Sequence, residues 1–244
     1  MSWKIILQYR WRRLIAVIGA AVAAIGLVVA SPQSYESVLD QTDHTVSAET
    51  SVEDERALEV LARLEIKGRA PKTGYNREEF YRTWPVVDGC SLRQRIIKRE
   101  LGEMAQLSDD NCTVISGELD EAYTGQHLVF YEKADLSKGI QIDHVVALSD
   151  AWQKGAQGLT SEKRYELATD PLNLLAVDAS ANQQKSDGDA ATWLPKNKGF
   201  RCQYVARQVS VKYKYGLWVT RAEHDAIERV LKACPDEKAV GVAL

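Results

Sequence analysis

The chain has 244 residues, of which 45% are hydrophobic and 27% are charged, and its formal net charge is −3. This length allows one good-sized domain with appendages. The chain contains no internal repeat and no low-complexity tract, which excludes a repeat protein. None of the four cysteines forms a Cys-x-x-Cys pair, which argues against a structural zinc site.

The first 30 residues have the pattern of an export segment. Four basic residues precede an unbroken apolar run over residues 14–30, no acidic residue occurs before Glu36, and the run ends in the small residues Val28-Val29-Ala30. We therefore expect residues 1–30 to be a cleaved signal peptide. Because a run of 17 residues lies at the lower limit for crossing a bilayer, a retained membrane anchor is the alternative. In both cases we expect the rest of the chain to be secreted or otherwise extracytoplasmic.

Two short segments separate the export segment from the main domain. Residues 31–66 carry nine acidic residues against two arginines, and residues 31–52 are polar and without period, so we predict a polar acidic linker over 31–52. Apolar residues then recur near helical spacing, which predicts a short helix and a loop over 53–74. We place the folded domain at 75–235 and a C-terminal tail at 236–244.

The folded domain is predicted to be of the α+β class. The patterns predict helices over residues 91–101, 149–155 and 161–169, and strands over 113–115, 127–131, 139–146 and 172–177. A further helix is expected near Ala181, with Asp178 or Ser180 as its N-cap, and a last helix after Thr220, with a capping box to Glu223. The order of strand, long excursion, strand and helix over residues 139–187 is that of a ββα unit.

All four cysteines follow the export segment. An even number of cysteines in an exported chain favours disulfides. Of the three possible pairings we prefer Cys90–Cys112 with Cys202–Cys234, because each bond then closes a local loop. Four buried thiols are the alternative.

Polar residues at the predicted strand ends make a candidate site for phosphodiester hydrolysis. This reaction needs an activated water, a cation that stabilises charge on phosphorus, and help for the leaving oxygen. His144 is suited to be the general base, and the oxygens of Asp143 and Asn182 suit Mg²⁺ or Mn²⁺. Neighbouring strand residues alternate in direction, so we expect His144 to address the water without binding the metal.

Basic residues after this motif are candidates for contacts with phosphate. Lys185 lies three residues after Asn182 on the same helical face, placed to meet phosphate, while Asp187 is expected to cap, to pair with Lys185 or to touch the metal site. A wider basic group is either a DNA track or ordinary surface: Lys196, Lys198, Arg201, Lys212 and Lys214.

Residues 90–234 resemble the exported HNH nuclease-like proteins that are grouped with the C-terminal domain of the GmrSD modification-dependent restriction enzymes. The resemblance rests on TVISGELDEAYTG (113–125), IDHVVALSDAWQKGA (142–156), DPLNLLAVDASANQQKSDGDAATWLP (170–195) and RCQYVARQVSVKYKYGL (201–217). It implies a ββα-metal (HNH) core within a single mixed domain, with Asp143 and Asn182 on the metal and His144 as base. It also implies that Asn173 bonds to backbone across the excursion and fixes the loop that aims His144. Asn182 stands where the name HNH has its last histidine.

Our leading interpretation is an exported, metal-dependent HNH endonuclease that cleaves DNA, with RNA as an alternative substrate. A catalytically inactive extracytoplasmic module that binds nucleic acid or a cell-envelope polymer is the second interpretation. Restriction of modified DNA is the third, and the export segment argues against it. The sequence implies no protein partner, and membrane contact only if residues 1–30 are retained.

Overall fold

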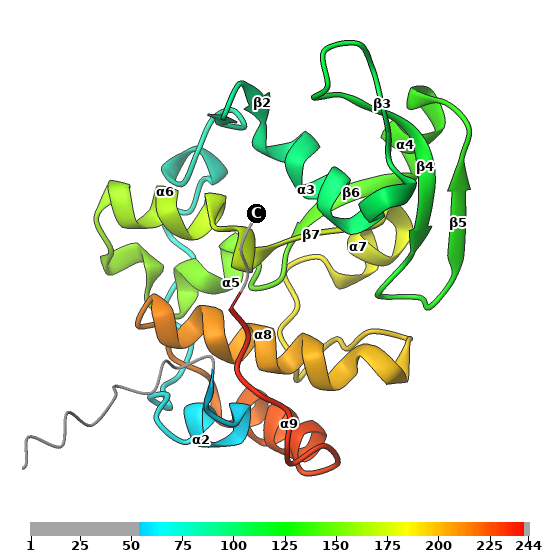
Figure 1. The fold of residues 1–244 in the computed structure, drawn as a ribbon. Helices are drawn as coiled ribbons and strands as arrows, with labels where there is room; N and C mark the ends of the chain where they lie inside the picture. Colours follow the sequence, from blue (N-terminus) through cyan, green and yellow to red (C-terminus); the bar gives the residue numbers. More distant parts are fainter. Residues whose placement is uncertain (1–53, 242–244) are drawn as a thin grey trace, which may run out of the picture. The chain divides into compact units, whose positions relative to one another are not determined.

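The computed structural model describes residues 54–241, which belong to one mixed α+β unit (Figure 1). The predicted export segment and linker lie outside the described residues. Among the helices of residues 54–241, none is long and apolar enough to cross a membrane.

The described elements, in which η denotes a 3₁₀ turn, are α2 (Ala57–Leu61), η2 (Arg77–Glu79), β1 (Val86–Val87), β2 (Cys90–Ser91), α3 (Leu92–Leu101), η3 (Gly102–Met104), β3 (Gln106–Leu107), β4 (Val114–Asp120), β5 (His127–Phe130), α4 (Lys133–Gly139), β6 (Ile140–His144), α5 (Leu148–Gln153), η4 (Ala156–Gly158), α6 (Ser161–Thr169), η5 (Pro171–Asn173), β7 (Leu174–Asp178), α7 (Ala179–Lys185), η6 (Lys198–Phe200), α8 (Arg201–Lys214) and α9 (Arg221–Leu231). The strands form three small antiparallel sheets, in the orders β1-β2, β3-β4-β5 and β6-β7.

Strands β6 and β7 and helix α7 follow the predicted order. The two strands pair antiparallel, with His144 opposite Leu174 at the end of β6. Helix α7 begins directly after β7, and the Asp178 side chain accepts a hydrogen bond from the Ala181 backbone N at 2.8 Å, so the N-cap prediction is confirmed for Asp178. Helices α5 and α6 lie in the excursion between the strands.

The second strand begins two residues later than predicted. Pro171 opens a 3₁₀ turn instead, and the Asp170 carboxylate caps this turn by accepting a hydrogen bond from the Leu172 backbone N at 2.9 Å. Asn173 therefore lies in the turn before β7, and not in the strand.

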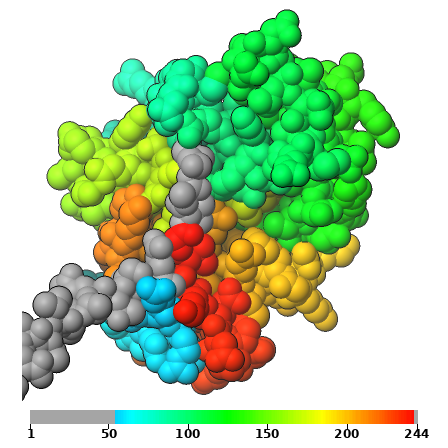
Figure 2. Space-filling view, viewed as in Figure 1, coloured from blue at the N-terminus to red at the C-terminus, as the bar shows by residue number. Residues whose placement is uncertain are grey.

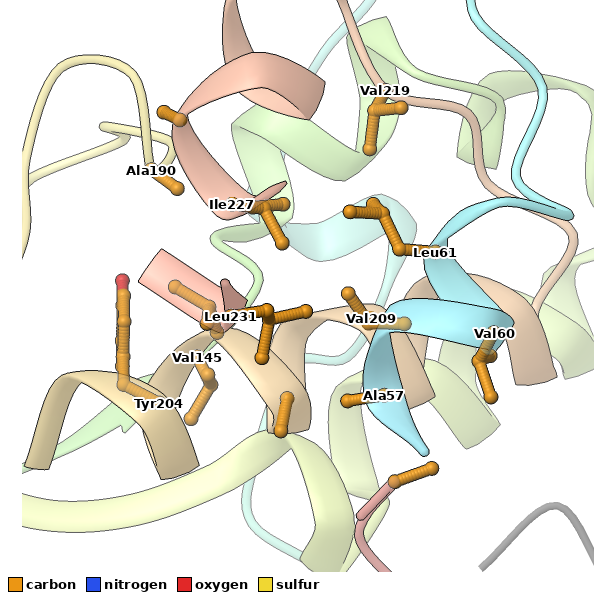
Figure 3. Packing of buried hydrophobic residues seen from close by; sticks show 14 of the residues in the cluster. Ala57, Val60, Leu61, Val145, Ala190, Tyr204, Val209, Val219, Ile227 and Leu231 are labelled. Atoms are coloured by element: carbon orange, nitrogen blue, oxygen red, sulfur yellow. The ribbon is translucent and has the colours of Figure 1, made fainter. Parts of the chain in front are cut away.

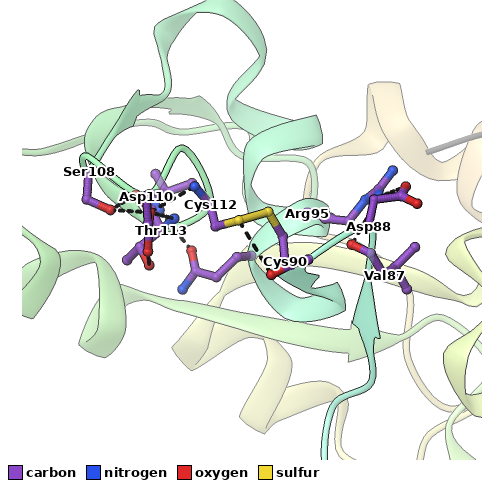
Figure 4. Close-up of a disulfide and its surroundings, with 11 residues drawn as sticks. Val87, Asp88, Cys90, Arg95, Ser108, Asp110, Cys112 and Thr113 are labelled. Carbon is purple, nitrogen blue, oxygen red and sulfur yellow. Dashed lines mark hydrogen bonds and ion pairs between the residues drawn. A yellow bond between two sulfur atoms is a disulfide. The ribbon is translucent and has the colours of Figure 1, made fainter.

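Helix α3 packs its apolar face against the sheets. Its four apolar residues are buried in one cluster with residues of β4, β6 and β7. The predicted disulfide between Cys90 and Cys112 is confirmed, and it joins β2, just before α3, to the loop before β4 (Figure 4). Asp110 organises that loop by accepting hydrogen bonds from the backbone N atoms of Cys112 and Thr113 at 2.8 and 2.9 Å.

Helix α2 is shorter than the predicted helix, yet it belongs to the main hydrophobic core. Its buried residues pack with α8 and α9, as the side chains of Leu61, Val209 and Ile227 show in Figure 3. In the space-filling view, α2 and α9 meet on one face of the molecule (Figure 2). The second predicted disulfide, Cys202–Cys234, is also confirmed and ties the start of α8 to the segment after α9. The predicted capping box of Thr220 and Glu223 at the start of α9 is present.

Candidate active site

A cavity of about 260 Å³ lies where β6 ends, beside α7. Side chains from three separate parts of the chain line it: Tyr75 and Arg77; Ile142, Asp143, His144, Ala147, Leu148 and Ser149; and Asn182, Ser186 and Asp187. Three of the five predicted site residues, Asp143, His144 and Asn182, are among them. The other two, Asn173 and Lys185, are buried and support this site from within the protein.

The Asp143 carboxylate is held by two donors. Oδ1 accepts a hydrogen bond from the Lys185 ammonium at 2.9 Å, and Oδ2 accepts one from the hydroxyl of the fully buried Tyr123. Burial raises the pKa of the Asp143 carboxyl above its ordinary value, and Lys185 and Tyr123 offset this effect only in part. Each oxygen has a second lone pair, so the carboxylate keeps capacity for a ligand from the cavity.

The His144 ring is held in one tautomer. Nε2 lies 3.0 Å from the Ala168 carbonyl oxygen, and because a carbonyl only accepts, Nε2 carries the proton and donates it. Nδ1 is therefore the basic nitrogen. Burial, together with the nearby charge of Arg77, lowers the pKa of His144 to about 3, so the ring is neutral at neutral pH. Trp84 lies nearly parallel to the imidazole, at an angle of 9° and a distance of 6.2 Å between ring centroids.

Asn173 bonds to backbone across the excursion, as the family resemblance implied. It is fully buried, and its Oδ1 accepts a hydrogen bond from the Val146 backbone N at 2.8 Å. Its Nδ2 donates to the carbonyl oxygens of Val146 at 3.3 Å and Leu167 at 3.2 Å. These bonds connect the backbone just after His144 to the helix whose Ala168 carbonyl holds the imidazole.

Two arginines in turn hold the backbone around Asn173. Arg207 and Arg99 both donate to the carbonyl oxygen of Pro171, at 2.9 and 3.0 Å, and both donate to that of Leu174, at 2.8 and 2.6 Å. Arg207 also donates to the Leu172 carbonyl oxygen at 2.6 Å. Burial lowers the pKa of Arg207 to about 10, which leaves it charged at neutral pH. Neither arginine was predicted from the sequence, because an arginine on an amphipathic helix normally faces solvent.

The donor set fits a hard divalent cation. Nδ2 of Asn182 donates to Gln141 Oε1 at 2.9 Å, which orients the amide and leaves Oδ1 as its ligand atom. A carboxylate and an amide oxygen on one polar cavity are the ligand types that Mg²⁺ and Mn²⁺ prefer. Cys202, Cys234 and Glu237 also lie close together in the described part of the chain, but both sulfurs belong to a disulfide and are not metal ligands there.

Lys185 does not occupy the position we predicted for it. It shares a helix face with Asn182, but that face lies against β6, and Lys185 is only 1% exposed. Its ammonium donates to Asp143 Oδ1 at 2.9 Å and to the His144 carbonyl oxygen at 2.8 Å. The ammonium therefore meets two protein oxygens instead of a phosphate.

The segment before the predicted motif contributes to the cavity as well. Arg77 lines it, and Lys72 of the same segment donates a hydrogen bond to Asp187 at 3.1 Å. Asp187 also accepts a hydrogen bond from Ser149 at 3.1 Å, so its partners are these two residues and not Lys185. Arg77 was not predicted, because it lies in a segment rich in aromatic residues (75–84), which is typical of core packing.

A cluster of charges lies next to the cavity; we call it the buried charge cluster, because all of its members except the exposed Arg69 are buried. It consists of three cations and three carboxylates: Arg69, Lys154 and Lys212 with Asp150, Asp189 and Glu223. Lys154 lies 2.7, 2.8 and 2.6 Å from the three carboxylates in turn. Lys212 is fully buried here, so the interpretation of Lys212 as part of a DNA track or of ordinary surface is wrong.

Comparison with known proteins identifies the family. Residues 92–230 match the family model of the C-terminal domain of the GmrSD restriction endonucleases. A protein of Arthroderma benhamiae, named as an uncharacterized secreted protein, is 33% identical over 181 residues, which cover 73% of this chain and 84% of that protein. No solved structure matches the chain. The chain belongs to the family of GmrSD restriction endonuclease C-terminal domains.

Proposed function

We propose that this protein is an exported, metal-dependent HNH endonuclease that hydrolyses phosphodiester bonds of DNA. One observation carries the proposal: a neutral imidazole with a basic Nδ1 borders the same cavity as a carboxylate and an amide oxygen. The family supports a nuclease, and β6, β7 and α7 have the order that a ββα-metal core requires.

The metal would be Mg²⁺ or Mn²⁺ on Asp143 and Asn182. When bound, it supplies a Lewis acid that stabilises negative charge on the phosphate and on the leaving oxygen. Lys185 and Tyr123 fix the carboxylate from the protein side, and Gln141 fixes the amide. These partners orient the two ligands toward the cavity.

The chemistry of the chain's own residues follows from the tautomer of His144. Nδ1 takes a proton from a water in the cavity, while the Ala168 carbonyl oxygen holds the opposite nitrogen and stabilises the imidazolium that forms. The water oxygen forms a bond to phosphorus, the bond from phosphorus to the 3′-oxygen breaks, and the released oxygen takes a proton from solvent. Asn173 keeps the backbone that carries His144 in register with the Ala168 carbonyl.

Export is supported by the N-terminal sequence pattern and by the secreted relative. Both disulfides suit an oxidising compartment. An exported enzyme would meet free nucleic acid outside the cell, so we propose DNA as substrate and treat RNA as an outcome of the test.

The test is cleavage of supercoiled plasmid and of a labelled RNA by the purified protein with its disulfides intact. We expect nicking with Mg²⁺ or Mn²⁺, none with EDTA, and a loss of about 100- to 10,000-fold in His144→Ala, the range for removal of a catalytic base.

A matched control is His127→Ala, because His127 is exposed and does not line the cavity. Full activity in His144→Ala would contradict the mechanism. A folded wild-type protein that retains DNA on a gel but never cleaves it would instead identify a binding module.

A further inference from the structure

Arg77 is a cation on the wall of the catalytic cavity, supplied by a segment that precedes the matched region 92–230. The other cations of this segment have carboxylate partners, since Arg69 pairs with Asp150 and Asp189, and Lys72 pairs with Asp187. Among the ion pairs of residues 54–241, Arg77 has no carboxylate partner. Its positive charge is therefore not neutralised within the described part of the chain.

The guanidinium of Arg77 contacts Tyr81, although Arg77 itself is exposed. It donates a hydrogen bond to the hydroxyl of Tyr81, and its Cζ lies 5.2 Å from the centroid of the same ring. The Tyr81 ring lies 5.9 Å from the His144 ring, so one aromatic side chain joins the cation to the base. Such stacking leaves the remaining N–H donors of the guanidinium free for a ligand.

The charges around the cavity favour an anion. Two carboxylates line it, and each has a cationic partner: Asp143 with Lys185, and Asp187 with Lys72. Arg77 adds one uncompensated positive charge to these two neutral pairs. A planar guanidinium is well matched to two oxygens of a phosphate, which it binds with parallel hydrogen bonds.

We propose that Arg77 binds the scissile phosphodiester and holds it beside His144. The inference rests on the proposed function and extends it, because it makes residues outside the matched region part of the substrate site. The cavity of residues 92–230 alone would then contain the base and the metal ligands but not this phosphate contact.

The test uses Arg77→Ala, Arg77→Lys and the control Arg82→Ala in the full exported protein. Arg82 is an arginine of the same segment, is 81% exposed, forms a 3.7 Å ion pair with Glu78, and does not line the cavity. Binding of a fluorescent oligodeoxynucleotide is measured by anisotropy in EDTA between about 50 and 200 mM KCl, where binding by phosphate contacts falls steeply with salt. The slope of log K against log[salt] is negative. We expect Arg77→Ala to make it less steep by about 1, and Arg82→Ala to leave it unchanged.

Cleavage with Mg²⁺ gives the second readout. We expect kcat/KM to fall about 100-fold in Arg77→Ala, as for the loss of one preorganised donor, and to be partly restored in Arg77→Lys. Equal slopes and equal rates for Arg77→Ala and Arg82→Ala would overturn the inference, and so would a loss of rate without a change of slope. A wild-type protein that never cleaves, but whose salt slope falls in Arg77→Ala alone, would refute the nuclease and keep the phosphate contact.

Discussion

Two sets of buried charges lie side by side in this molecule, and they are built differently. In the buried charge cluster, three carboxylates face three cations, and Lys154 touches all three carboxylates. At the candidate site, Asp143 pairs within residues 54–241 with one ammonium, that of Lys185, and also borders the cavity. The sequence connects the two sets closely, because Asp150 and Asp189 follow the cavity residues Ser149 and Asp187 by one and two positions.

Asp189 of the charge cluster and Asp143 of the candidate site differ in their affinity for protons. Burial alone would raise the pKa of Asp189, but Lys154 and Arg69 outweigh it, and this pKa lies below the ordinary value. Burial raises the pKa of Asp143, and Lys185 does not outweigh it. The charge cluster is thus compensated from within the protein, whereas Asp143 is stabilised incompletely and gains from a further cation. This difference is the one expected between a structural ion network and the proposed ligand site.

The largest effect is expected from Lys154→Met. The change leaves three buried carboxylates with two cations, so we expect the free energy of unfolding to fall by about 3–5 kcal/mol in urea titrations. Lys163→Met is the matched control, because Lys163 is 58% exposed and its one ion pair within residues 54–241 is with Glu166; it should change stability by less than about 1 kcal/mol. Equal losses of unfolding free energy in the two variants would mean that Lys154 contributes no more to stability than an exposed lysine.

Lys185→Met should cost less, about 1–3 kcal/mol, the range for leaving one buried polar group without its partner. It also removes a buried ammonium, but the single carboxylate left behind has a raised pKa and can take up a proton. Urea titration of the two lysine variants side by side measures the difference. If Lys185→Met lost as much unfolding free energy as Lys154→Met, Asp143 would need its cation for stability as much as the carboxylates of the cluster do.

The sequence predicted where the candidate site residues lie better than it predicted the side chains that support them. Asp143, His144 and Asn182 stand at a strand end and in a helix that periodicity and capping rules place correctly, so the sequence brings them together. Both disulfides were predicted because short sequence separations limit the pairing. Local patterns therefore carry this part of the structure.

The supports depend on tertiary packing, which local patterns do not carry. Arg207 and Lys212 lie on α8 and read as solvated charges until neighbouring segments bury them. Lys185 was placed on the correct helix face, but the sequence did not show that this face lies against β6. Arg77 reaches the cavity from a separate segment, and its local sequence gave no signal of that approach.

Two Asp→Asn variants should show opposite pH dependence of stability. Asp189 has a lowered pKa in the folded state, so its contribution is present above the unfolded pKa and is lost as pH falls below about 4. Asp143 has a raised pKa, so its ionisation costs stability, and this cost appears as pH rises from about 4 through the folded pKa. In EDTA, the stability of Asp189→Asn relative to wild type should therefore worsen with rising pH, and that of Asp143→Asn should improve. Urea titration from pH 3 to 7 measures these changes. If the stability of both variants relative to wild type changed in the same direction with pH, the distinction between the two sets would be wrong.

The smallest expected effect is a change of protonation alone. It is measured by comparing the titration of two histidines, His127 and His144. The hydrogen bond to Asp120 and the charge of Glu118 raise the pKa of the exposed His127 above its ordinary 6.5, whereas burial lowers that of His144 to about 3. In an NMR titration of the metal-free protein upward from pH 5, we expect the His127 ring to lose its proton at a pH above 6.5 and the His144 ring to stay neutral throughout with hydrogen on Nε2. The Nε2 tautomer follows from the Ala168 carbonyl, and a proton on Nδ1 would block the water that the base must meet. A His144 ring that becomes charged near pH 6.5 would show that the cavity is open to water around the base, and the base would then lose activity in mild acid.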